Sequence, residues 1–413
     1  MFSRYIINRI LGTPDADLLT GTYRKNFILG LPGDDTINGD FSIRSPNGAG
    51  VEVTGAADIL LGGSGNDTVL GDGDIFVVPG DAGGITRITG GNDLIKGQAG
   101  DDVLDGDGTI FADFLTDDAV LVGGNDTVFG GTGDDTMRGD GESAEYGSAE
   151  ALLKGGDDLL NGGKGRDEIQ GDGAAAAAFG GSAILIGGDD NISGGRDADV
   201  LWGDGVVWGR DSGPHELIGG ADTVVGGHGD DTIYGDGTTN VGRSPGTMTG
   251  GNDLLLGGRG DDLIFGDGDV QSGGVAPEFH TLDGGDDTIN GGRGDDILYG
   301  DGLIRVQGEV SITDVNGGAD TFIFNDRSGI DTIMDFRSGD GDVIDLSGQR
   351  QLSWSRFDVN DSGVLDVGDA FVTFDDGSTS MDLGAARGWQ ADRDVVTLLD
   401  VTGLTESDFL FVA

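Results

Sequence analysis

The sequence predicts an all-β solenoid of about nine coils, each about 32 residues long, with one insert per coil and a β-rich C-terminal cap. Glycine accounts for 85 of the 413 residues, far above its share of about 7% in globular proteins. The segments GGNDLIKGQAGDDVLDGDG from Gly90 and GGNDTVFGGTGDDTMRGDG from Gly123 match almost position by position. The Asp of each Gly-Asp-Gly (GDG) triplet, with Asp40 of Gly-Asp-Phe as the first and degenerate copy, recurs every 31 to 35 residues, at Asp40, Asp72, Asp107, Asp140, Asp172, Asp204, Asp236, Asp267 and Asp301.

The charge of the chain is strongly one-sided. Lys and Arg total 23 against 75 Asp and Glu, which gives a formal net charge of −52 and a pI near 4.1. A compact chain of this charge repels itself, so we expect cations to neutralise it. Nucleic acid is excluded as a main partner, because phosphate binding needs a basic surface, and an anionic membrane surface is disfavoured likewise. High charge with few aromatic residues is also typical of disordered chains, but the regular repeat argues against disorder.

Further features narrow the class of protein. The chain has no Cys, so we expect neither disulfides nor thiolate chemistry. No segment approaches 18 uninterrupted apolar residues, and we expect no membrane span. The N-terminal stretch MFSRYIINRIL is broken by Arg9 and lacks a small-residue cleavage site, so we expect no cleavable signal peptide.

Each repeat contains two nine-residue blocks of the form G-G-x-G-x-D-x-U-x, in which U is apolar. The three residues after each block Asp, for example Thr136, Met137 and Arg138, alternate as in a strand and point one side chain inward. Glycine permits the turn that is needed every nine residues. The pattern predicts an inner apolar column made of Val128, Met137, Leu160, Ile169, Ile192, Leu201, Val224, Ile233, Leu255, Ile264, Ile289 and Leu298.

The blocks GGTGDDTMR, GGSGNDTVL and GGRGDDLIF resemble the calcium-binding nonapeptides of the RTX (repeats-in-toxin) family. The resemblance covers about residues 12 to 335. It implies a right-handed parallel β-roll, in which two nonapeptides form one coil and Ca²⁺ ions bind between coils.

The block Asp residues are the candidate metal ligands. Stacked coils bring their like charges close together, which calls for a bridging cation. Ca²⁺ fits best, because it takes six to eight oxygen ligands in flexible geometry, whereas Mg²⁺ is stricter and Zn²⁺ prefers His or Cys. Roughly 15 to 20 ions would offset most of the charge. The predicted ligands are Asp35, Asp58, Asp67, Asp93, Asp102, Asp126, Asp135, Asp158, Asp167, Asp190, Asp199, Asp222, Asp231, Asp253, Asp262, Asp287, Asp296 and Asp320.

Alternatives stay open for these acidic residues. Glycine-aspartate turns can be merely solvated at the surface, although the recurrence of Asp at one position argues against this. The GDG aspartates from Asp72 to Asp301 either complete a calcium site or only begin the following turn through their side chains.

After each GDG triplet comes an insert of roughly 13 to 17 residues. Inserts such as TIFADFLTDDAVLV, residues 109–122, indicate a strand, a turn and a second strand, the pattern of a hairpin. They would stack into a lateral wall, or each would supply a long third side of its coil. Such a wall can be a binding face or can only shield a sheet edge. The alanine-rich run 174–179 and the pair Trp202 and Trp208 are interpreted as packing or surface variation, with no ligand implied.

From Gly317 the repeat gives way to GGADTFIFNDRSGIDTIMDFRSGDGDVIDLSG and, later, VTLLDVTGLTESDFLFVA. These segments resemble the cap that ends the RTX domains of serralysin-type proteases and alginate epimerases, which implies export by the type I secretion machinery. We expect an N-terminal strand and degenerate first repeat (1–40), a β-roll with stacked inserts (41–316), and a cap with the secretion region (317–413). The cap is expected to bury Phe322, Phe324, Ile330, Ile333, Phe336, Val343, Ile344 and Leu346.

Within this region, DVNDSGVLDVGD at residues 358–369 fits an EF-hand-like calcium loop. Ser at position 5 and the short Asp at position 12 depart from the pattern, and an ordinary acidic turn is the alternative. The predicted ligands are Asp358, Asn360, Ser362, Asp366, Asp369 and the carbonyl group of Val364.

Catalysis finds little support in the sequence, and we expect no enzyme. His215, His228 and His280 belong to no H-E-x-x-H motif, and no G-x-S-x-G elbow is present. The favoured hypothesis is a structural protein, secreted or at the cell surface, whose folding and head-to-tail self-assembly through SRYIINRIL are triggered by extracellular Ca²⁺. The alternative is a calcium-stabilised adhesin or glycan-binding module whose insert face holds an extracellular polysaccharide or a cell surface.

Overall fold

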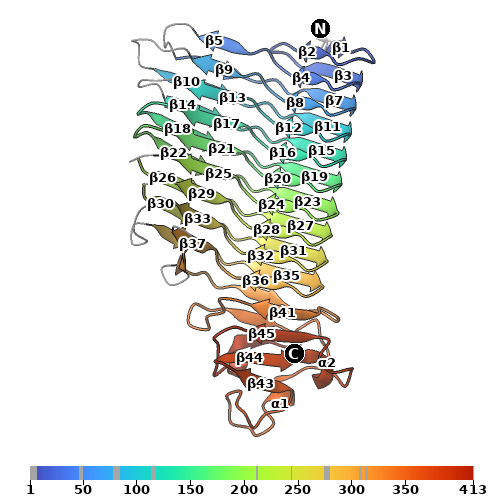
Figure 1. Ribbon diagram of the computed structural model, residues 1–413, viewed down its shortest axis with the longest axis vertical. Coiled ribbons are helices and arrows are strands. Elements are labelled where there is room, and N and C mark those ends of the chain that lie inside the picture. Colours follow the sequence, from blue (N-terminus) through green and yellow to red (C-terminus); the bar gives the residue numbers. More distant parts are fainter. Residues whose placement is uncertain are drawn as a thin grey trace, which may run out of the picture.

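A typical coil contains four strands, here β15 (Thr127–Thr132), β16 (Thr136–Arg138), β17 (Glu142–Glu145) and β18 (Glu150–Lys154). Each pairs in parallel with the equivalent strand of the next coil. The chain is therefore an all-β parallel solenoid of about nine coils, as predicted (Figure 1). The computed structural model describes residues 7–45, 50–77, 84–112, 118–210, 213–242, 244–273, 280–306, 309–311 and 315–412.

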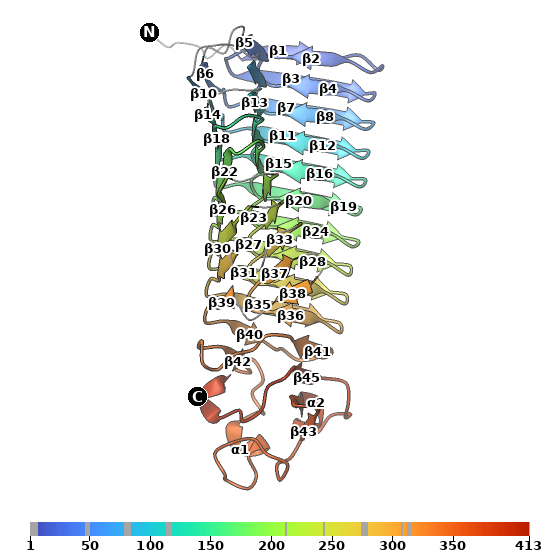
Figure 2. The ribbon, with the colours of Figure 1, turned by 60° about the vertical axis from the view of Figure 1, so that its left-hand side comes forward.

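Two long sheets, here named roll sheets 1 and 2, carry the nonapeptide blocks (Figure 2). Roll sheet 1 contains β1 (Asn8–Leu11), β3 (Asn26–Pro32), β7 (Ile59–Ser64), β11 (Leu94–Ala99), β15, β19 (Leu159–Lys164), β23 (Asn191–Arg196), β27 (Thr223–His228), β31 (Leu254–Arg259), β35 (Thr288–Arg293), β40 (Thr321–Ile323), β42 (Val343–Asp345) and β46 (Phe409–Leu410). Roll sheet 2 contains β2 (Leu18–Thr20), β4 (Thr36–Asn38), β8 (Thr68–Leu70), β12 (Val103–Asp105), β16, β20 (Glu168–Gln170), β24 (Val200–Trp202), β28 (Thr232–Tyr234), β32 (Leu263–Phe265), β36 (Ile297–Tyr299), β41 (Ile330–Ile333), β45 (Val395–Leu398), β44 (Ser378–Asp382) and β43 (Val372–Asp375).

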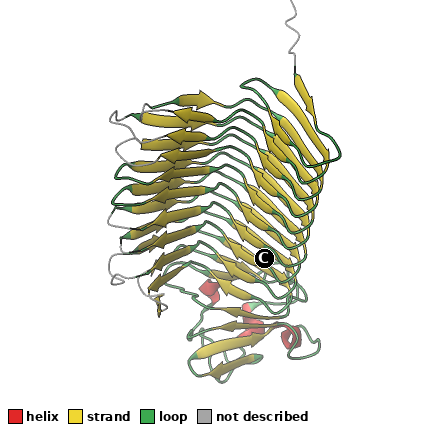
Figure 3. Cartoon of the chain, turned by 45° about the horizontal axis from the view of Figure 1, so that its top comes forward, coloured by secondary structure: helices red, strands yellow, loops and turns green. Residues whose placement is uncertain are grey.

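The inserts build two further sheets beside the roll, named insert sheets 1 and 2 (Figure 3). Insert sheet 1 contains β5 (Ile43–Ser45), β9 (Ile75–Val77), β13 (Thr109–Ala112), β17, β21 (Ala174–Ala177), β25 (Val206–Gly209), β29 (Thr238–Val241), β33 (Asp269–Ser272), β37 (Leu303–Val306) and β38 (Glu309–Ser311). Insert sheet 2 contains β6 (Glu52–Thr54), β10 (Ile85–Thr89), β14 (Asp118–Val122), β18, β22 (Ser182–Ile186), β26 (His215–Ile218), β30 (Gly246–Thr249), β34 (Thr281–Asp283) and β39 (Val315–Asn316).

The hairpin expectation is wrong for most inserts. In residues 109–122, β13 pairs with β9 and β17, and β14 pairs with β10 and β18, so the two strands of one insert belong to different sheets. Neighbouring coils offer each strand an in-register partner along its whole length, and this pairing replaces the hairpin. Among the described insert strands, only β37 and β38 pair with each other in antiparallel fashion.

The two pairs of sheets enclose separate apolar cores. All twelve residues of the predicted inner column are fully buried in the roll core, which confirms that prediction. The insert core contains Ile110, Leu121, Leu153 and Leu185, among others, from insert sheets 1 and 2. Because the inserts have a core of their own, they form a lateral lobe rather than a third side of the roll.

The cap continues both roll sheets and then closes them. Strands β40, β42 and β46 extend roll sheet 1, and β41 and β45 extend roll sheet 2. The short helices α1 (Trp354–Phe357), α2 (Leu383–Ala386) and η3 (Glu406–Asp408) lie in this part of the chain. No helix of the described residues is long and apolar enough to cross a bilayer.

The apolar residues predicted for the cap are mostly buried. Val343 is half-buried, whereas Phe322, Phe324, Ile333, Phe336, Ile344 and Leu346 are buried. The prediction is wrong for Ile330, whose side chain is 46% exposed. Alternation along β41 turns Asp331 and Ile333 inward and leaves Ile330 outside.

Candidate metal sites

The first candidate site lies in the tight turn between the two roll strands of each coil. At the end of β15 and just after it, Gly131 and Gly133 have φ values of +121° and +129°, which favour glycine, and Asp135 ends the turn before β16. Asp135 is 1% exposed, and its backbone N–H donates a 2.9 Å hydrogen bond to Oδ1 of Asp167 in the next coil. Its own Oδ1 accepts the backbone N–H of Asp102 at 2.9 Å. Bonds of this kind define the corner column, which contains Asp17, Asp35, Asp67, Asp102, Asp135, Asp167, Asp199, Asp231, Asp262, Asp296 and Asp331.

The second candidate site lies where the chain enters and leaves each insert. Just before β15, the backbone N–H of Asp126 donates to Oδ1 of Asp158 at 2.5 Å. The same bond defines the neck column, which contains Asn26, Asp58, Asp93, Asp126, Asp158, Asp190, Asp222, Asp253, Asp287, Asp320 and Asp342. Together the two columns contain every block Asp that the sequence singles out.

The second oxygen of most of these carboxylates is buried and accepts no hydrogen bond from the described residues. A buried oxygen of this kind is costly unless something compensates it, so these atoms mark where a cation fits. The atoms are Oδ2 of Asp35, Asp67, Asp93, Asp102, Asp126, Asp135, Asp158, Asp167, Asp190, Asp199, Asp222, Asp231, Asp253, Asp262, Asp287, Asp296 and Asp331.

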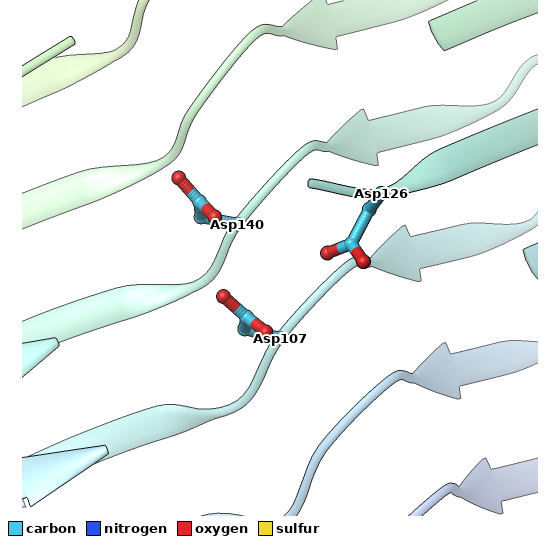
Figure 4. Close-up of side chains that lie close together, drawn as sticks. All are labelled: Asp107, Asp126 and Asp140. Carbon is cyan, nitrogen blue, oxygen red and sulfur yellow. The ribbon is translucent and has the colours of Figure 1, made fainter. Parts of the chain in front are cut away.

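The GDG aspartates gather with the neck column. Carboxylate oxygens of Asp107, Asp126 and Asp140 lie within 4.8 Å of one another (Figure 4), and Asp140, Asp158 and Asp172 form a second such group. Asp107 and Asp126 flank the insert that contains β13 and β14, and Asp140 begins the next insert. A cation at this position would therefore tie the insert lobe to the roll.

One GDG carboxylate can play both of the roles that the sequence leaves open. Oδ2 of Asp107 accepts the N–H of Gly124 at 3.0 Å, and Oδ2 of Asp140 accepts the N–H of Gly156 at 3.1 Å. Oδ1 of each is buried and finds no hydrogen-bond donor in the described part of the chain. One oxygen thus holds the turn, and the other is available to a metal ion.

Glycines line both sites because a side chain would not fit. A Cβ on Gly130 would lie 2.3 Å from Oδ2 of Asp135, and a Cβ on Gly123 would lie 1.6 Å from Oδ1 of Asp140. The spare oxygens therefore face bare backbone at close range.

Burial disfavours the ionised form of the carboxylates at these sites and so raises their pKa values. Burial, with the charge of Asp167 in addition, raises the pKa of Asp135 to about 7. Burial raises the pKa of Asp199 to about 8, with further contributions from the charges of neighbouring corner residues. The pKa of Asp126 rises well above its ordinary value, first by burial and then by the charges of Asp158 and Asp93. A bound divalent cation reverses this cost and stabilises the ionised carboxylates.

The donor set fits Ca²⁺. The groups that converge in the corner and neck sites are oxygen atoms, which Ca²⁺ takes in numbers of six to eight. The nitrogen ligands that Zn²⁺ prefers are used elsewhere. In the insert lobe, Nδ1 of His215 accepts the N–H of Ala183 at 3.2 Å, and Nδ1 of His280 accepts the N–H of Gly246 at 3.1 Å.

The EF-hand-like loop begins directly after α1 and leads into β43, so one short helix and a strand flank it instead of two helices. Asp358 accepts the N–H groups of Ser362 and Gly363 at 3.0 and 2.9 Å. Asp369 accepts the N–H of Asp366 at 2.8 Å, and the carbonyl of Val364 accepts the hydroxyl of Ser362 at 2.7 Å. Asn360 donates to Asp366 at 3.0 Å. The predicted ligands thus face into one turn, and their binding of calcium stays a prediction.

Sequence reasoning missed the residues that extend both columns. Asp331 and Asp342 continue them into the cap, and Asp17 and Asn26 begin them in the first coils. The order Asp331-Thr332-Ile333 repeats that of Asp135-Thr136-Met137, and this was the available signal. Some of the glycines of the nine-residue block are missing around Asp331, so the block pattern does not identify this segment as a repeat.

The sequence matches the family model of the RTX calcium-binding nonapeptide repeat over residues 11–41, 52–74, 89–109, 122–142, 154–175, 186–205, 219–241, 249–270 and 282–302. The chain belongs to this family. Each matched segment contains a corner Asp and a neck residue, and all but the first, 11–41, contain a GDG Asp. RTX nonapeptide repeats bind Ca²⁺, and this RTX protein is therefore a calcium-binding protein.

Among solved structures, this RTX protein is similar to the "X-ray crystal structure of a hyperactive, Ca2+-dependent, beta-helical antifreeze protein from an Antarctic bacterium". The sequences are 20% identical, the match covers 79% of this chain and 86% of that one, and the TM-score is 0.19. A TM-score this low carries no argument about function. The comparison with curated proteins gave no match.

Proposed function

We propose that this RTX protein is a secreted structural scaffold that winds into its solenoid only when it meets extracellular Ca²⁺. The observation that carries this function is the pair of buried carboxylate columns. Each column joins every coil to the next, and its spare oxygens are buried without a compensating charge. Folding and metal binding are then one process, because the sites exist only between stacked coils. The low calcium of the cytosol would keep the chain unwound before export.

The test is to remove the metal. In EDTA at neutral pH we expect an expanded chain with little β-sheet signal in circular dichroism. Millimolar Ca²⁺ should restore a compact β-rich form, and equal Mg²⁺ should not, because it demands stricter geometry. A compact, β-rich chain in EDTA would contradict the proposal that folding requires Ca²⁺.

The block and GDG aspartates that the sequence singles out are the ligands we propose for this calcium, at the corner and neck sites. The loop at 358–369 is proposed as a separate site. Export by a type I system is proposed from the resemblance of the cap to those of serralysin-type proteases and alginate epimerases. Deletion of residues 317–413 should then abolish export by a co-expressed type I system, and undiminished export would contradict this.

A non-catalytic role is part of the same proposal. The buried block and GDG carboxylates accept backbone N–H groups, as Asp167 and Asp107 do, and so do His215 and His280. Hydrolase and lyase assays on extracellular polysaccharides should give no turnover. A turnover that a single point variant removes would overturn this part.

Self-assembly through the first coil is supported by its exposed edge. Leu11 in β1 and Leu18 in β2 are 67% and 74% exposed. Sheet edges of this kind pair with other chains, and the cap covers the opposite end of the roll. Head-to-tail contact would therefore set the first coil of one copy against the cap of the next. In millimolar Ca²⁺, Leu18→Lys should reduce the assemblies seen by electron microscopy, whereas Leu159→Lys in the middle of the roll should not. Monomers at every wild-type concentration would defeat self-assembly.

A second candidate function is glycan binding by the insert face. It is favoured by Trp208 on insert sheet 1, whose large indole side chain is 49% exposed.

A further inference from the structure

One hollow lies on the outer face of the insert lobe. Residues of insert sheet 1 alternate between the insert core, as Ile110 does, and the opposite face, as Phe111 does. Along the register column that contains Phe76 and Phe111, the two coils after Phe111 contribute Ala144 and Ala176. The following coil contributes Trp208. Beside Trp208, the small side chains of Ala176 and Ala178 leave a hollow of about 390 Å³, a size typical of ligand pockets.

The wall of this hollow combines ring faces with hydrogen-bonding groups of both kinds. Trp208 and Tyr146 line it and are 49% and 41% exposed. The carboxylate of Glu142 accepts hydrogen bonds, the guanidinium of Arg210 donates them, and the amide of Asn240 does both.

Trp208 has no structural role that explains its exposure. Trp202 stacks on Tyr234 with ring centroids 5.8 Å apart, whereas Trp208 makes no ring contact with another described aromatic residue. A large exposed indole beside polar groups is typical of a binding surface.

The mixture of groups selects the class of ligand. A sugar ring has an apolar C–H face that stacks on an aromatic ring, and hydroxyls that both donate and accept. An anion would be repelled by Glu142, by Glu145 and by the net charge of −52. An organic cation would be attracted by these carboxylates but would leave the donors of Arg210 and Asn240 without an acceptor. A neutral saccharide suits all the groups at once.

We propose that this hollow binds a neutral saccharide, with one sugar ring stacked on Trp208 and its hydroxyls held by Glu142, Arg210 and Asn240. This site deepens the glycan-binding function and rests on it, while the calcium-dependent scaffold stands independently of it.

The experiment uses the full-length, calcium-loaded chain. Maltohexaose, cellohexaose and mannohexaose are titrated by calorimetry and by tryptophan fluorescence, with glucose, choline chloride and a hexameric galacturonate as further arms. We expect saturable binding of at least one neutral hexasaccharide. Tighter binding of the hexamer than of glucose would identify a polysaccharide as the source, and equal binding per ring would identify a free sugar.

Variants locate the site. Trp208→Ala should weaken binding about tenfold or more, because the stacking face is lost, and Trp208→Phe should restore part of it. Phe76→Ala, in the same column four coils away, is the matched control and should bind as the wild type does. Circular dichroism in Ca²⁺ verifies that each variant is wound.

Three results would overturn the site. The first is no saturable binding of any neutral hexasaccharide, and the second is equal binding by the Trp208→Ala and Phe76→Ala variants. The third is saturation by choline or galacturonate alone, which would show that the ligand class is wrong. All three leave the calcium-dependent winding of the same samples unchanged, so failure here is distinct from failure of the scaffold function.

Discussion

The backbone N–H of Asp135 donates a 2.9 Å hydrogen bond to Oδ1 of Asp167, one coil further along the chain. The other oxygen of Asp167 is buried and has no hydrogen-bond partner among the described residues. One side chain therefore joins two coils and also holds a buried oxygen at the position that we propose for a cation. Because the same carboxylate serves both purposes, a change at this position should affect coil stacking and metal binding together.

Replacement of a single corner ligand should weaken calcium binding. Asp135→Asn keeps the acceptor for Asp102 but places an amide nitrogen or neutral oxygen at the metal. We expect a loss of about 1–3 kcal/mol in stability with calcium, because a buried polar group is left uncompensated. Thermal unfolding in millimolar Ca²⁺ measures this. Asp134→Asn, at the exposed neighbouring position, is the control, and equal effects of the two variants would contradict the assignment.

A GDG aspartate should bind metal rather than only hold a turn. Asp140 belongs to both three-carboxylate groups of the neck. Asp140→Asn should therefore lower the number of Ca²⁺ ions bound per chain, whereas Asp157→Asn at an exposed position should not. Calorimetric titration and metal analysis of dialysed protein give the stoichiometry. An unchanged number of ions, with slightly lower stability, would restrict these residues to the turn.

The calcium-free chain should become more stable in acid. Without metal, the pKa of Asp135 is raised to about 7 and that of Asp199 to about 8, above an unfolded value of about 3.9. The folded form therefore binds protons more tightly than the unfolded form. This stabilisation is complete below the unfolded pKa and is lost as the pH rises through about 7 to 8.

In EDTA, acidification from about pH 8 to about pH 5 should increase the β-sheet signal. Calcium affinity should fall over the same range, because protons and Ca²⁺ compete for the same oxygens. Sedimentation controls for aggregation. A circular dichroism spectrum independent of pH in EDTA would show that these carboxylates do not limit winding.

The glycine next to a corner ligand should tolerate no side chain. In Gly130→Ala the new Cβ would approach Oδ2 of Asp135 to 2.3 Å and the carbonyl oxygen of Gly162 to 2.8 Å. We expect a loss of about 2–3 kcal/mol and weaker calcium binding. Gly339→Ala is the control, because its Cβ would have no neighbour within 4 Å. Equal midpoints of thermal unfolding for the two variants would contradict this reading of the site.

The loop at 358–369 should add one calcium ion that can be followed by fluorescence. Nε1 of Trp354 donates to Oδ2 of Asp358 at 3.1 Å. Binding of Ca²⁺ by Asp358 should disturb this bond and change the fluorescence emission of Trp354. The contribution of Trp354 is obtained by subtracting the emission of the Trp354→Phe variant. Asp358→Asn should remove the change and one ion. An unaltered stoichiometry would leave the loop as an acidic turn.

The repeat made much of this architecture predictable from the sequence. The inner apolar column and the stacked block aspartates follow from one spacing, because residues about 32 apart occupy equivalent places in neighbouring coils. The insert strands were harder, because alternation in residues 109–122 indicates two strands but not their partners. Partner choice depends on equivalent inserts one coil away. The ends of the columns, at Asp17 and Asp342, were missed because the glycines that frame the interior blocks are incomplete there.

Each interior strand is hydrogen-bonded only to its equivalents in the coils before and after, so coils can be added or removed without changing the pairing pattern. Excision of the 32 residues from Asp126 to Asp157 would place Asp158 where Asp126 now stands and leave both ends unaltered. Every unit gained or lost changes the rod by about 4.8 Å, the spacing of hydrogen-bonded strands. Recombination between repeats can therefore change the length of the solenoid by whole coils, and the number of coils sets the distance between its two ends.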